Sequence, residues 1–426
     1  MRNRIIITFI VFSSLLVFSA CNLRTINTEN NFEKEIVTDL KVVPTKEIQE
    51  WKHEPFSGEG KLEHIWSFDA PKPNNERYYG VISIPDGWLI DTNRYPEVTE
   101  LSLQMATIKP ENGEIINSSM TGAIDRRTGV TDGVFVYSDA GMQGSAPHSC
   151  WQLSDNSIKW RIQDVSIHGA NWSKMSIING MLFYVSVNSS NQTFFTRLEP
   201  ATGKIIWSIP FSDRYIVDYA FSQDNAILLF SDSKVESIAL LSGDRTGLGF
   251  EELEYISMEI VMDSLFLLTS DGFFIRRNLN SLEKETTFQL SENNISRPKL
   301  NRLYTLIHLG LCQSSITKLN DTTLLLSIKQ DSSSCVYYIF DNQEQTTVEL
   351  SSDFVYYMND QLITYKSDFN SNVDTIQSLN PQTLEPIWWI DLTDSDIGEN
   401  PRVIWCDWRG VLVMSDTKLV CYNAAK

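Results

Sequence analysis

The sequence predicts an all-β protein, a β-propeller in which four-stranded blades form a closed ring. Short alternating strands, separated by Gly, Asn, Asp and Ser, follow one another from Lys61 onward. No amphipathic helical stretch of useful length interrupts them. A hairpin pattern recurs at intervals of mostly 39 to 45 residues. Repeats of about this length are typical of one four-stranded propeller blade.

The recurring hairpin is clearest in "TRLEPATGKIIW", residues 196–207. Thr202-Gly203 supplies the turn, because glycine adopts positive φ without Cβ strain, and the apolar flanks supply the two strands. Good copies occupy residues 106–117, 150–160 and 377–389, and weaker copies lie between them. The apolar anchors of the copies are Ile108, Leu153, Leu198, Leu240, Leu279, Phe340 and Leu379, with a single long interval of 61 residues.

The two ends of the repeat region predict how the ring closes. The terminal "TKLVCYNAAK" is half a hairpin, and "GKLEHIWSFDA", residues 60–70, resembles the missing half. We therefore expect Leu62–Phe68 to pair as the outer strand of the blade that ends at Tyr422, which removes an exposed sheet edge. Residues 61–426 provide about 46 residues for each of eight blades. Seven blades are the alternative, because of the long interval.

The N-terminal residues predict a lipoprotein signal peptide at residues 1–20. Arg2 and Arg4 precede an apolar run from Ile5 to Phe18, which is short for a transmembrane helix. Ser19-Ala20-Cys21 then resembles the bacterial lipobox. We expect Cys21 to carry acyl chains, two or more of which anchor stably. The alternative is an ordinary cleaved signal peptide followed by an incidental cysteine.

Residues 21–60 are polar and rich in Asn, Glu and Lys, which predicts a tether between the lipidated cysteine and a propeller at residues 61–426. Removal of Arg2 and Arg4 leaves 33 basic against 54 acidic residues, a mature charge of −21. That acidity argues against binding to nucleic acid. The signal peptide and the lipidated cysteine predict a protein of the bacterial cell envelope that is lipid-anchored at the outer membrane or cell surface.

The hairpin sequence resembles the PQQ-like, or quinoprotein-type, β-propeller repeat, with its apolar strand, Thr-Gly turn, Lys and Trp. The resemblance covers most of residues 60–426 and implies architecture rather than chemistry. Gly203 closes the turn, and the outer-strand residues Trp66, Trp160, Trp207 and Trp388 lie where a Trp packs between neighbouring blades. We expect these five residues to be structural rather than a binding site, with Trp207 buried enough that its loss costs about 3–5 kcal/mol.

The sequence predicts no catalytic residue, cofactor or metal. Quinoprotein dehydrogenases that share the repeat cover their cofactor with a disulfide between adjacent cysteines, and this chain has no Cys-Cys pair. The acidic loop Asp391–Pro401 superficially suits calcium through Asp394, Asp396 and Gly398, but an EF-hand needs Glu where Trp405 stands. We interpret that loop as solvated.

The glycine-rich loop Ser138–Cys150 carries His148 and lacks the lysine and helix of a phosphate cradle. It is either an exposed loop over one mouth of the ring or a partner contact. Cys312 and Cys335 fall near one rim of a blade, so a disulfide between them is conceivable. Cys406 and Cys421 lie on first and third strands, too far apart for a disulfide, and are predicted to be buried free thiols.

Anchor and fold together favour a non-enzymatic function. The layout is similar to BamB-type lipoproteins of outer-membrane protein assembly, which implies a scaffold that binds other envelope proteins. Two alternatives stay open at this point. One is a quinoprotein-like enzyme or small-ligand-binding propeller, and the other is a surface propeller that binds glycans through Trp and Tyr.

Overall fold

The structure is a computed structural model, and its described residues all belong to one compact unit at residues 46–426. They are residues 47–69, 81–91, 105–119, 125–139, 148–155, 157–162, 172–187, 192–212, 214–249, 253–290, 315–329, 335–344, 346–350, 354–367, 373–393, 397–398, 401–415 and 418–424.

The described residues form strands and turns and contain no helix. Accordingly, no helical segment in this part of the chain is long and apolar enough to cross a bilayer. The strands of the first half are β1 (Gly60–Asp69), β2 (Val81–Ile84), β3 (Gly87–Asp91), β4 (Met105–Ile108), β5 (Ile115–Ser119), β6 (Asp125–Thr131), β7 (Phe135–Asp139), β8 (His148–Gln152), β9 (Ile158–Arg161), β10 (Trp172–Ile178), β11 (Met181–Val187), β12 (Thr193–Leu198), β13 (Ile205–Phe211), β14 (Ile216–Phe221), β15 (Asn225–Phe230) and β16 (Val235–Ala239). Those of the second half are β17 (Arg245–Leu248), β18 (Tyr255–Val261), β19 (Ser264–Thr269), β20 (Phe273–Asn278), β21 (Lys284–Gln289), β22 (Ser315–Lys318), β23 (Thr323–Lys329), β24 (Cys335–Asp341), β25 (Thr346–Leu350), β26 (Phe354–Met358), β27 (Gln361–Ser367), β28 (Val373–Leu379), β29 (Pro386–Asp391), β30 (Arg402–Asp407), β31 (Gly410–Met414) and β32 (Lys418–Ala424).

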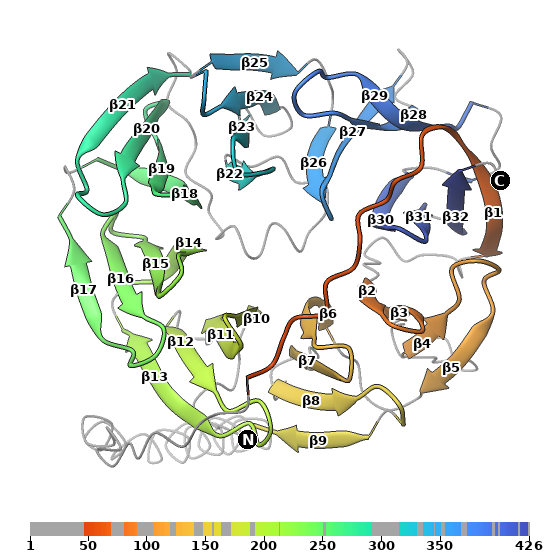
Figure 1. Cartoon of the computed structure of the whole chain (residues 1–426), viewed down its shortest axis with the longest axis horizontal. Helices are drawn as coiled ribbons and strands as arrows, with labels where there is room; N and C mark the ends of the chain where they lie inside the picture. The colour runs from red at the N-terminus through yellow and green to blue at the C-terminus, as the bar shows by residue number, and fades with distance from the viewer. Residues whose placement is uncertain are drawn as a thin grey trace, which may run out of the picture. The chain divides into compact units, whose positions relative to one another are not determined.

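Consecutive strands pair antiparallel in groups of four, and the groups follow one another around a ring (Figure 1). Six groups are separate four-stranded sheets, and the remaining eight strands join into one sheet of order β26-β27-β28-β29-β1-β32-β31-β30. The protein is a β-propeller, so the predicted all-β fold class is confirmed. The described strands fall into groups as an eight-bladed ring requires, while the blade count of the whole chain stays a prediction.

The ring closes through β1, as the sequence predicts. Leu62 pairs with Ala424, and the antiparallel ladder continues to Phe68 opposite Leu419. A register shift between His64 and Trp66 marks a bulge in β1. The predicted closure is confirmed, because the first described strand completes the blade of the last three.

The same strand also links two blades. Before it joins β32, β1 runs parallel to β29 on the outer edge of the neighbouring blade, with Gly60 opposite Trp388 and Lys61 opposite Trp389. Lys61 Nζ also lies 2.9 Å from Asp391 Oδ2. Two blades therefore share one continuous sheet at this seam.

The core lies between blades rather than within one. Phe183 and Phe195 of blade β10–β13 pack with Leu228 and Phe230 of blade β14–β17 in one buried cluster. The central strand β19 is buried at every position because both of its faces meet other blades. Its sequence is therefore a nearly continuous apolar run, without the alternation of apolar and polar residues that is typical of a half-exposed strand.

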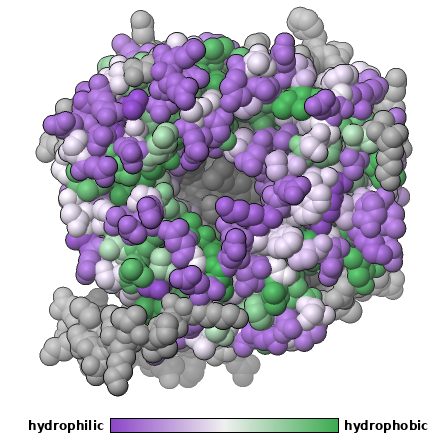
Figure 2. Space-filling model, in the orientation of Figure 1, coloured by the Kyte–Doolittle hydropathy of each residue, from purple (hydrophilic) through white to green (hydrophobic). Residues whose placement is uncertain are grey.

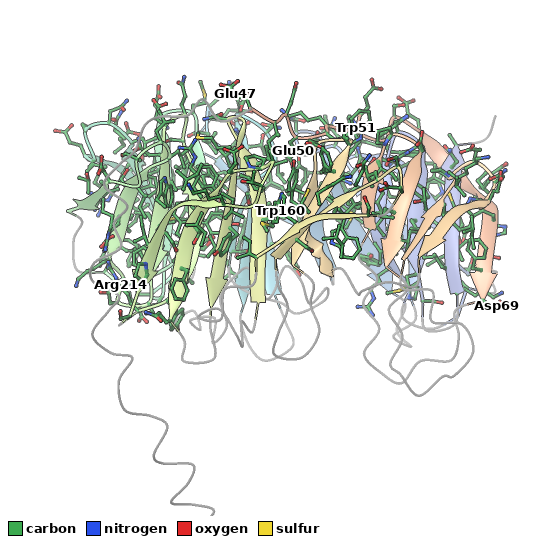
Figure 3. The ribbon with its side chains drawn as sticks, turned by 90° about the horizontal axis from the view of Figure 1, so that it is seen from below. Glu47, Glu50, Trp51, Asp69, Trp160 and Arg214 are labelled. Carbon is green, nitrogen blue, oxygen red and sulfur yellow. The ribbon has the colours of Figure 1, made fainter. Side chains whose placement is uncertain are left out.

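The turns between first and second strands and between third and fourth strands lie on one face, which we call the turn face. Backbone hydrogen bonds join the two kinds of turn within a blade, from Leu240 N to Asp224 O and from Leu279 N to Asp263 O, for example. Figure 3 shows Glu47, Glu50 and Trp51 at this edge of the ring, and Asp69 and Arg214 at the opposite edge.

Candidate functional site

An outer-strand tryptophan of one blade lies against the outer turn of the next. Trp160 on β9 donates its indole N–H to Pro200 O at 2.7 Å, across the blade boundary. Gly203 in the same turn has φ +69, and a Cβ there would lie 2.5 Å from Trp160 Cε3. The turn needs glycine for both reasons, since the backbone is left-handed and the indole occupies the space of a side chain.

The contact recurs at two other boundaries. Trp66 donates to Pro110 O at 2.6 Å and packs on Gly113, which has φ +75. Trp207 donates to Leu241 O at 3.2 Å and packs on Gly243. These contacts explain how the repeat residues join blades. That these residues take no part in binding a ligand stays a prediction.

Trp388 departs from this pattern. It is fully buried, donates its indole N–H to Gln361 Oε1 at 3.0 Å, and meets the ring of Phe56 edge to face. The next blade is completed by β1 and β32, which no hairpin joins, so no turn glycine is available to pack on Trp388. Phe56, which is 4% exposed, packs against Trp388 at this boundary.

Residues 47–59, which we call the strap, cross the turn face before entering β1 (Figure 1). Ile48 N donates to Gly180 O at 3.1 Å, and Trp51 N donates to Thr131 O at 2.8 Å. Farther along, Glu54 O accepts from Trp408 N at 3.1 Å, and Phe56 O accepts from the Gln361 amide at 3.2 Å. The strap thus touches the inner turns of four blades. The tether predicted for residues 21–60 includes these residues, but from Glu47 onward the chain lies on the ring.

A buried ion pair joins the last blade to the first. Asp407 has no exposed surface and lies 3.0 Å from Arg409 Nη2. The indoles of Trp88 and Trp405 donate to the same carboxylate oxygen, at 2.7 and 3.0 Å. Arg409 in turn donates to Ser83 Oγ at 2.6 Å across the boundary. Every charge here is matched inside the protein, as a buried ion pair requires.

The strap rests beside this ion pair. His53 lies edge-on to Trp405, with ring centroids 5.4 Å apart, and stacks near Trp408 at 6.4 Å. Arg409 places its guanidinium 4.2 Å from the Trp408 ring centroid, a cation–π contact. The repeat pattern of the sequence does not predict this cluster. The available signal was the alternation of aromatic and charged residues in "WCDWRG", residues 405–410.

Other buried polar groups on the innermost strands also serve contacts between blades. Asp218 Oδ2 accepts from Ser257 Oγ at 2.7 Å and from Met258 N at 2.9 Å. Ser257 Oγ accepts from Ile316 N of the following blade at 3.1 Å. These groups hold neighbouring blades in register, so their hydrogen-bonding capacity is used within the fold.

Exposed acidic side chains are spread over the turn face. Figure 2 shows a mostly hydrophilic surface around a central hollow, on the face drawn in Figure 1. The exposed acidic residues of the inner and outer turns are Asp86, Glu111, Glu114, Asp155, Asp224, Asp244, Asp263, Glu283, Asp321, Glu344, Asp360 and Glu385. Glu47, Glu50 and Glu54 of the strap add to them.

The acidic loop at Asp391–Pro401 is described only in part, and Asp394 and Asp396 lie outside the described residues. Hydrogen bonds from Thr393 and Lys61 lower the pKa of Asp391 to about 2. Among the described residues, no group of three or more His, Cys, Asp or Glu side chains is placed to hold a metal ion. The prediction that the chain takes no metal or cofactor stays a prediction.

The buried cysteines are free thiols. Cys406 and Cys421 are both fully buried and unpaired, so that prediction is confirmed. Burial raises the pKa of both thiols, and it raises the pKa of Cys150 to about 12. Cys21, Cys312, residues 140–147 and the side chains of His148 and Cys335 lie outside the described residues, so lipidation and the disulfide stay predictions. The predicted loop Ser138–Cys150 is shorter than expected, because β7 continues to Asp139 and β8 begins at His148.

These features define a rigid propeller with a strapped, acidic turn face. No family model matches the chain, and no curated protein matches it in sequence. Among solved structures, BamB from Moraxella catarrhalis is 10% identical with a TM-score of 0.47, covering 85% of this chain and 99% of its own. The computationally designed Ika8 protein is 10% identical with a TM-score of 0.49, covering 86% and 99%. The propeller architecture rests on the strand pairing above, and both comparisons leave the function open.

Proposed function

We propose that this protein is a lipid-anchored scaffold of the bacterial cell envelope that binds other proteins in the assembly of outer-membrane proteins. The anchor is Cys21, as the signal sequence and Ser19-Ala20-Cys21 indicate. The 25 residues from 22 to 46 could span at most about 90 Å when extended. That reach lets the propeller meet partners at a distance from the membrane.

One observation carries the binding role. The buried polar groups Asp218, Ser257 and Asp407 are engaged in hydrogen bonds between blades, whereas exposed carboxylates are numerous on the described turns of the turn face, where only Glu114 and Asp321 form ion pairs, with Lys109 and Lys318. A surface of fixed turns with exposed carboxylates is suited to recognition, because loops on a rigid scaffold hold their side chains in place. The acidity favours a partner surface rich in Lys and Arg.

A pull-down from detergent-solubilised membranes tests the proposal, with the lipidated protein as bait. We expect envelope proteins to be enriched, and to be lost when Asp224→Lys and Asp263→Lys reverse two exposed charges of the turn face. Glu349→Lys, on the exposed outer strand β25, is the matched control and should retain them. Equal enrichment by all three baits would contradict the role of the turn face.

Intact mass of the membrane-extracted protein tests the anchor separately. We expect a mature chain that begins at an acylated Cys21, and a Cys21→Ala variant that leaves the membrane fraction. An unmodified Cys21 would refute the anchor. A bound chromophore seen by absorbance would favour the quinoprotein-like alternative instead.

A further inference from the structure

We propose that the first part of the strap, residues 47–55, occupies a binding site for an extended polypeptide, and that a basic segment of a partner displaces it. The inference deepens the proposed scaffold function by naming the surface and the chemistry of its partner. The site is the track formed by the turns at Gly180, Thr131 and Trp408.

The track recognises backbone more than side chains. The hydrogen bonds between it and residues 47–55 all use main-chain atoms of the strap, those of Ile48, Trp51 and Glu54. The side chains of Ile48, Trp51 and His53 add packing contacts. Main-chain recognition accepts many sequences, as in other modes of extended-peptide binding. Ile48 and Trp51 are the two apolar anchors, and both are only half-buried. Trp51 packs on Gly133, where a Cβ would lie 2.9 Å from its ring.

The native segment is itself acidic and lies on a face rich in carboxylates. It carries Glu47, Glu50 and Glu54 against a single Lys52. The turns beneath it present the carboxylates of Asp132 and, on neighbouring blades, exposed Asp86 and Asp360. Like charges at a surface repel until salt screens them. A basic segment would therefore be attracted to these carboxylates, whereas the acidic strap is repelled by them.

Trp51 also leaves a hydrogen-bond donor unused. Its indole N–H is buried and has no partner among the described residues. A buried donor without a partner costs about 1–3 kcal/mol. Few backbone bonds, half-buried anchors, an unmatched donor and repulsive charges all lower the free energy needed to open this segment.

The second part of the strap is held differently. Phe56 is buried against Trp388, and its carbonyl accepts from Gln361. Pro55 stands between the two parts, where its fixed φ separates the loosely held segment from the buried one. Residues 47–55 can therefore leave the track while Phe56 keeps the ring closed.

A disulfide lock tests the proposal in the full chain. A Cβ built on Gly180 would lie 3.0 Å from Glu47 Cβ, close to the 3.5–4.5 Å of disulfides. Glu47→Cys with Gly180→Cys should therefore fix the strap when oxidised and free it when reduced. Glu47→Cys alone is the control for oxidation elsewhere. Because Gly180 has φ +76, the melting temperature of Gly180→Cys alone measures the strain that a cysteine adds to this turn. Failure of the double variant to form the disulfide, when Gly180→Cys alone keeps the melting temperature of the unchanged protein, would show that the strap does not lie on Gly180 and would overturn the proposal.

The probe is a fluorescent peptide of residues 46–57 that carries Glu47→Lys, Glu50→Lys and Glu54→Lys. We expect it to bind the reduced double variant and the control at least tenfold more tightly than it binds the oxidised variant. Binding should weaken with added salt, and adding Trp51→Ala to the peptide should weaken it at least fivefold. Equal affinity for locked and unlocked protein, or no effect of Trp51→Ala, would overturn the proposal.

The peptide experiment and the pull-down can fail separately. Envelope proteins that the locked protein still enriches would leave the scaffold role intact while excluding the track as its site. Loss of peptide binding on locking, with no envelope protein enriched by any bait, would leave the track intact while excluding the scaffold role.

Discussion

Phe56 and Trp388 meet edge to face, with ring centroids 6.0 Å apart and an interplanar angle of 89°, although they come from opposite ends of the propeller. At three other boundaries between blades, an outer-strand tryptophan packs on a turn glycine of the next blade. The blade closed by β1 and β32 has no such turn. The end of the strap therefore belongs to the closure of the ring as much as β1 does.

Shortened chains should separate the roles of the strap and of β1. A chain that begins at Glu47 should keep the melting temperature of the mature protein. One that begins at Glu59 should melt several degrees lower, because the packing on Trp388 is lost. One that begins at Ala70 should lose β1, open the ring and aggregate. Thermal unfolding and size-exclusion chromatography measure all three, and similar behaviour of all three would contradict the closure.

Gly203→Ala should destabilise the propeller by about 2–4 kcal/mol, because left-handed backbone strain adds to a clash with Trp160. Gly60→Ala has the same kind of φ, +78, but open space around it, so about 1 kcal/mol is expected. Gly247→Ala, with neither feature, should change little. Urea unfolding gives the three values. Equal losses for Gly203→Ala and Gly60→Ala would show that the clash with the Trp160 indole adds nothing to the free-energy loss.

Trp388→Ala should cost about 3–5 kcal/mol, the range for buried large-to-small aromatic changes. Trp388 has no exposed surface, whereas Trp207 is only half-buried. The loss expected from the sequence for Trp207→Ala is therefore too large, and about 1–3 kcal/mol is the revised value. The order of the two variants in chemical denaturation decides the matter; a larger loss for Trp207→Ala would contradict the burial described here.

Asp407→Ala should destabilise the fold by about 3–5 kcal/mol, since it leaves Arg409 without its partner and two indole N–H groups without an acceptor. A Trp88→Phe change removes one of those donors and keeps most of the packing, so it should cost far less. Both values come from urea unfolding at neutral pH. A loss below that of Trp88→Phe would mean that the ion pair does not hold this boundary.

Asp391→Asn should flatten the acid end of the stability profile. Its pKa falls from 3.8 to about 2 in the folded chain, through Thr393 and Lys61. A depressed pKa means that the stabilising contribution is present above pH 4 and is lost as pH falls toward 2. Unfolding measured between pH 5 and pH 2 should show a smaller decline in the variant. Because the group is exposed, the difference at neutral pH should be small.

The sequence predicts the parts of this fold that repeat. Ile108, Leu198 and Leu379 each end a third strand, as the spacing of the anchors requires. Leu62 pairs with β32, as expected when each end of the repeat region carries half of the hairpin motif and the two halves complete one blade. Periodicity suffices in both cases, since each blade buries the same kind of face against its neighbour.

The features of the turn face could not be predicted in this way. The strap has no periodic pattern, and its bonds use main-chain atoms such as Gly180 O, to which the sequence gives no signal. Asp407 meets Trp88 across 319 residues of chain, and Arg409 meets Ser83 across 326. Only closure of the ring brings those residues together, so no local sequence pattern predicts the contacts between them.

Closure through the two ends also dictates an order of biogenesis. The main ladder of β1 forms with β32, more than 300 residues farther along the chain, so β1 emerges from synthesis long before its partner exists. Throughout that interval β1 is an open edge that invites pairing with other chains. The exposed Lys61, Glu63 and His64 on its early residues place polar groups along that edge. Charged side chains on an edge strand disfavour pairing with other chains. Here they protect β1 until β32 has been synthesised.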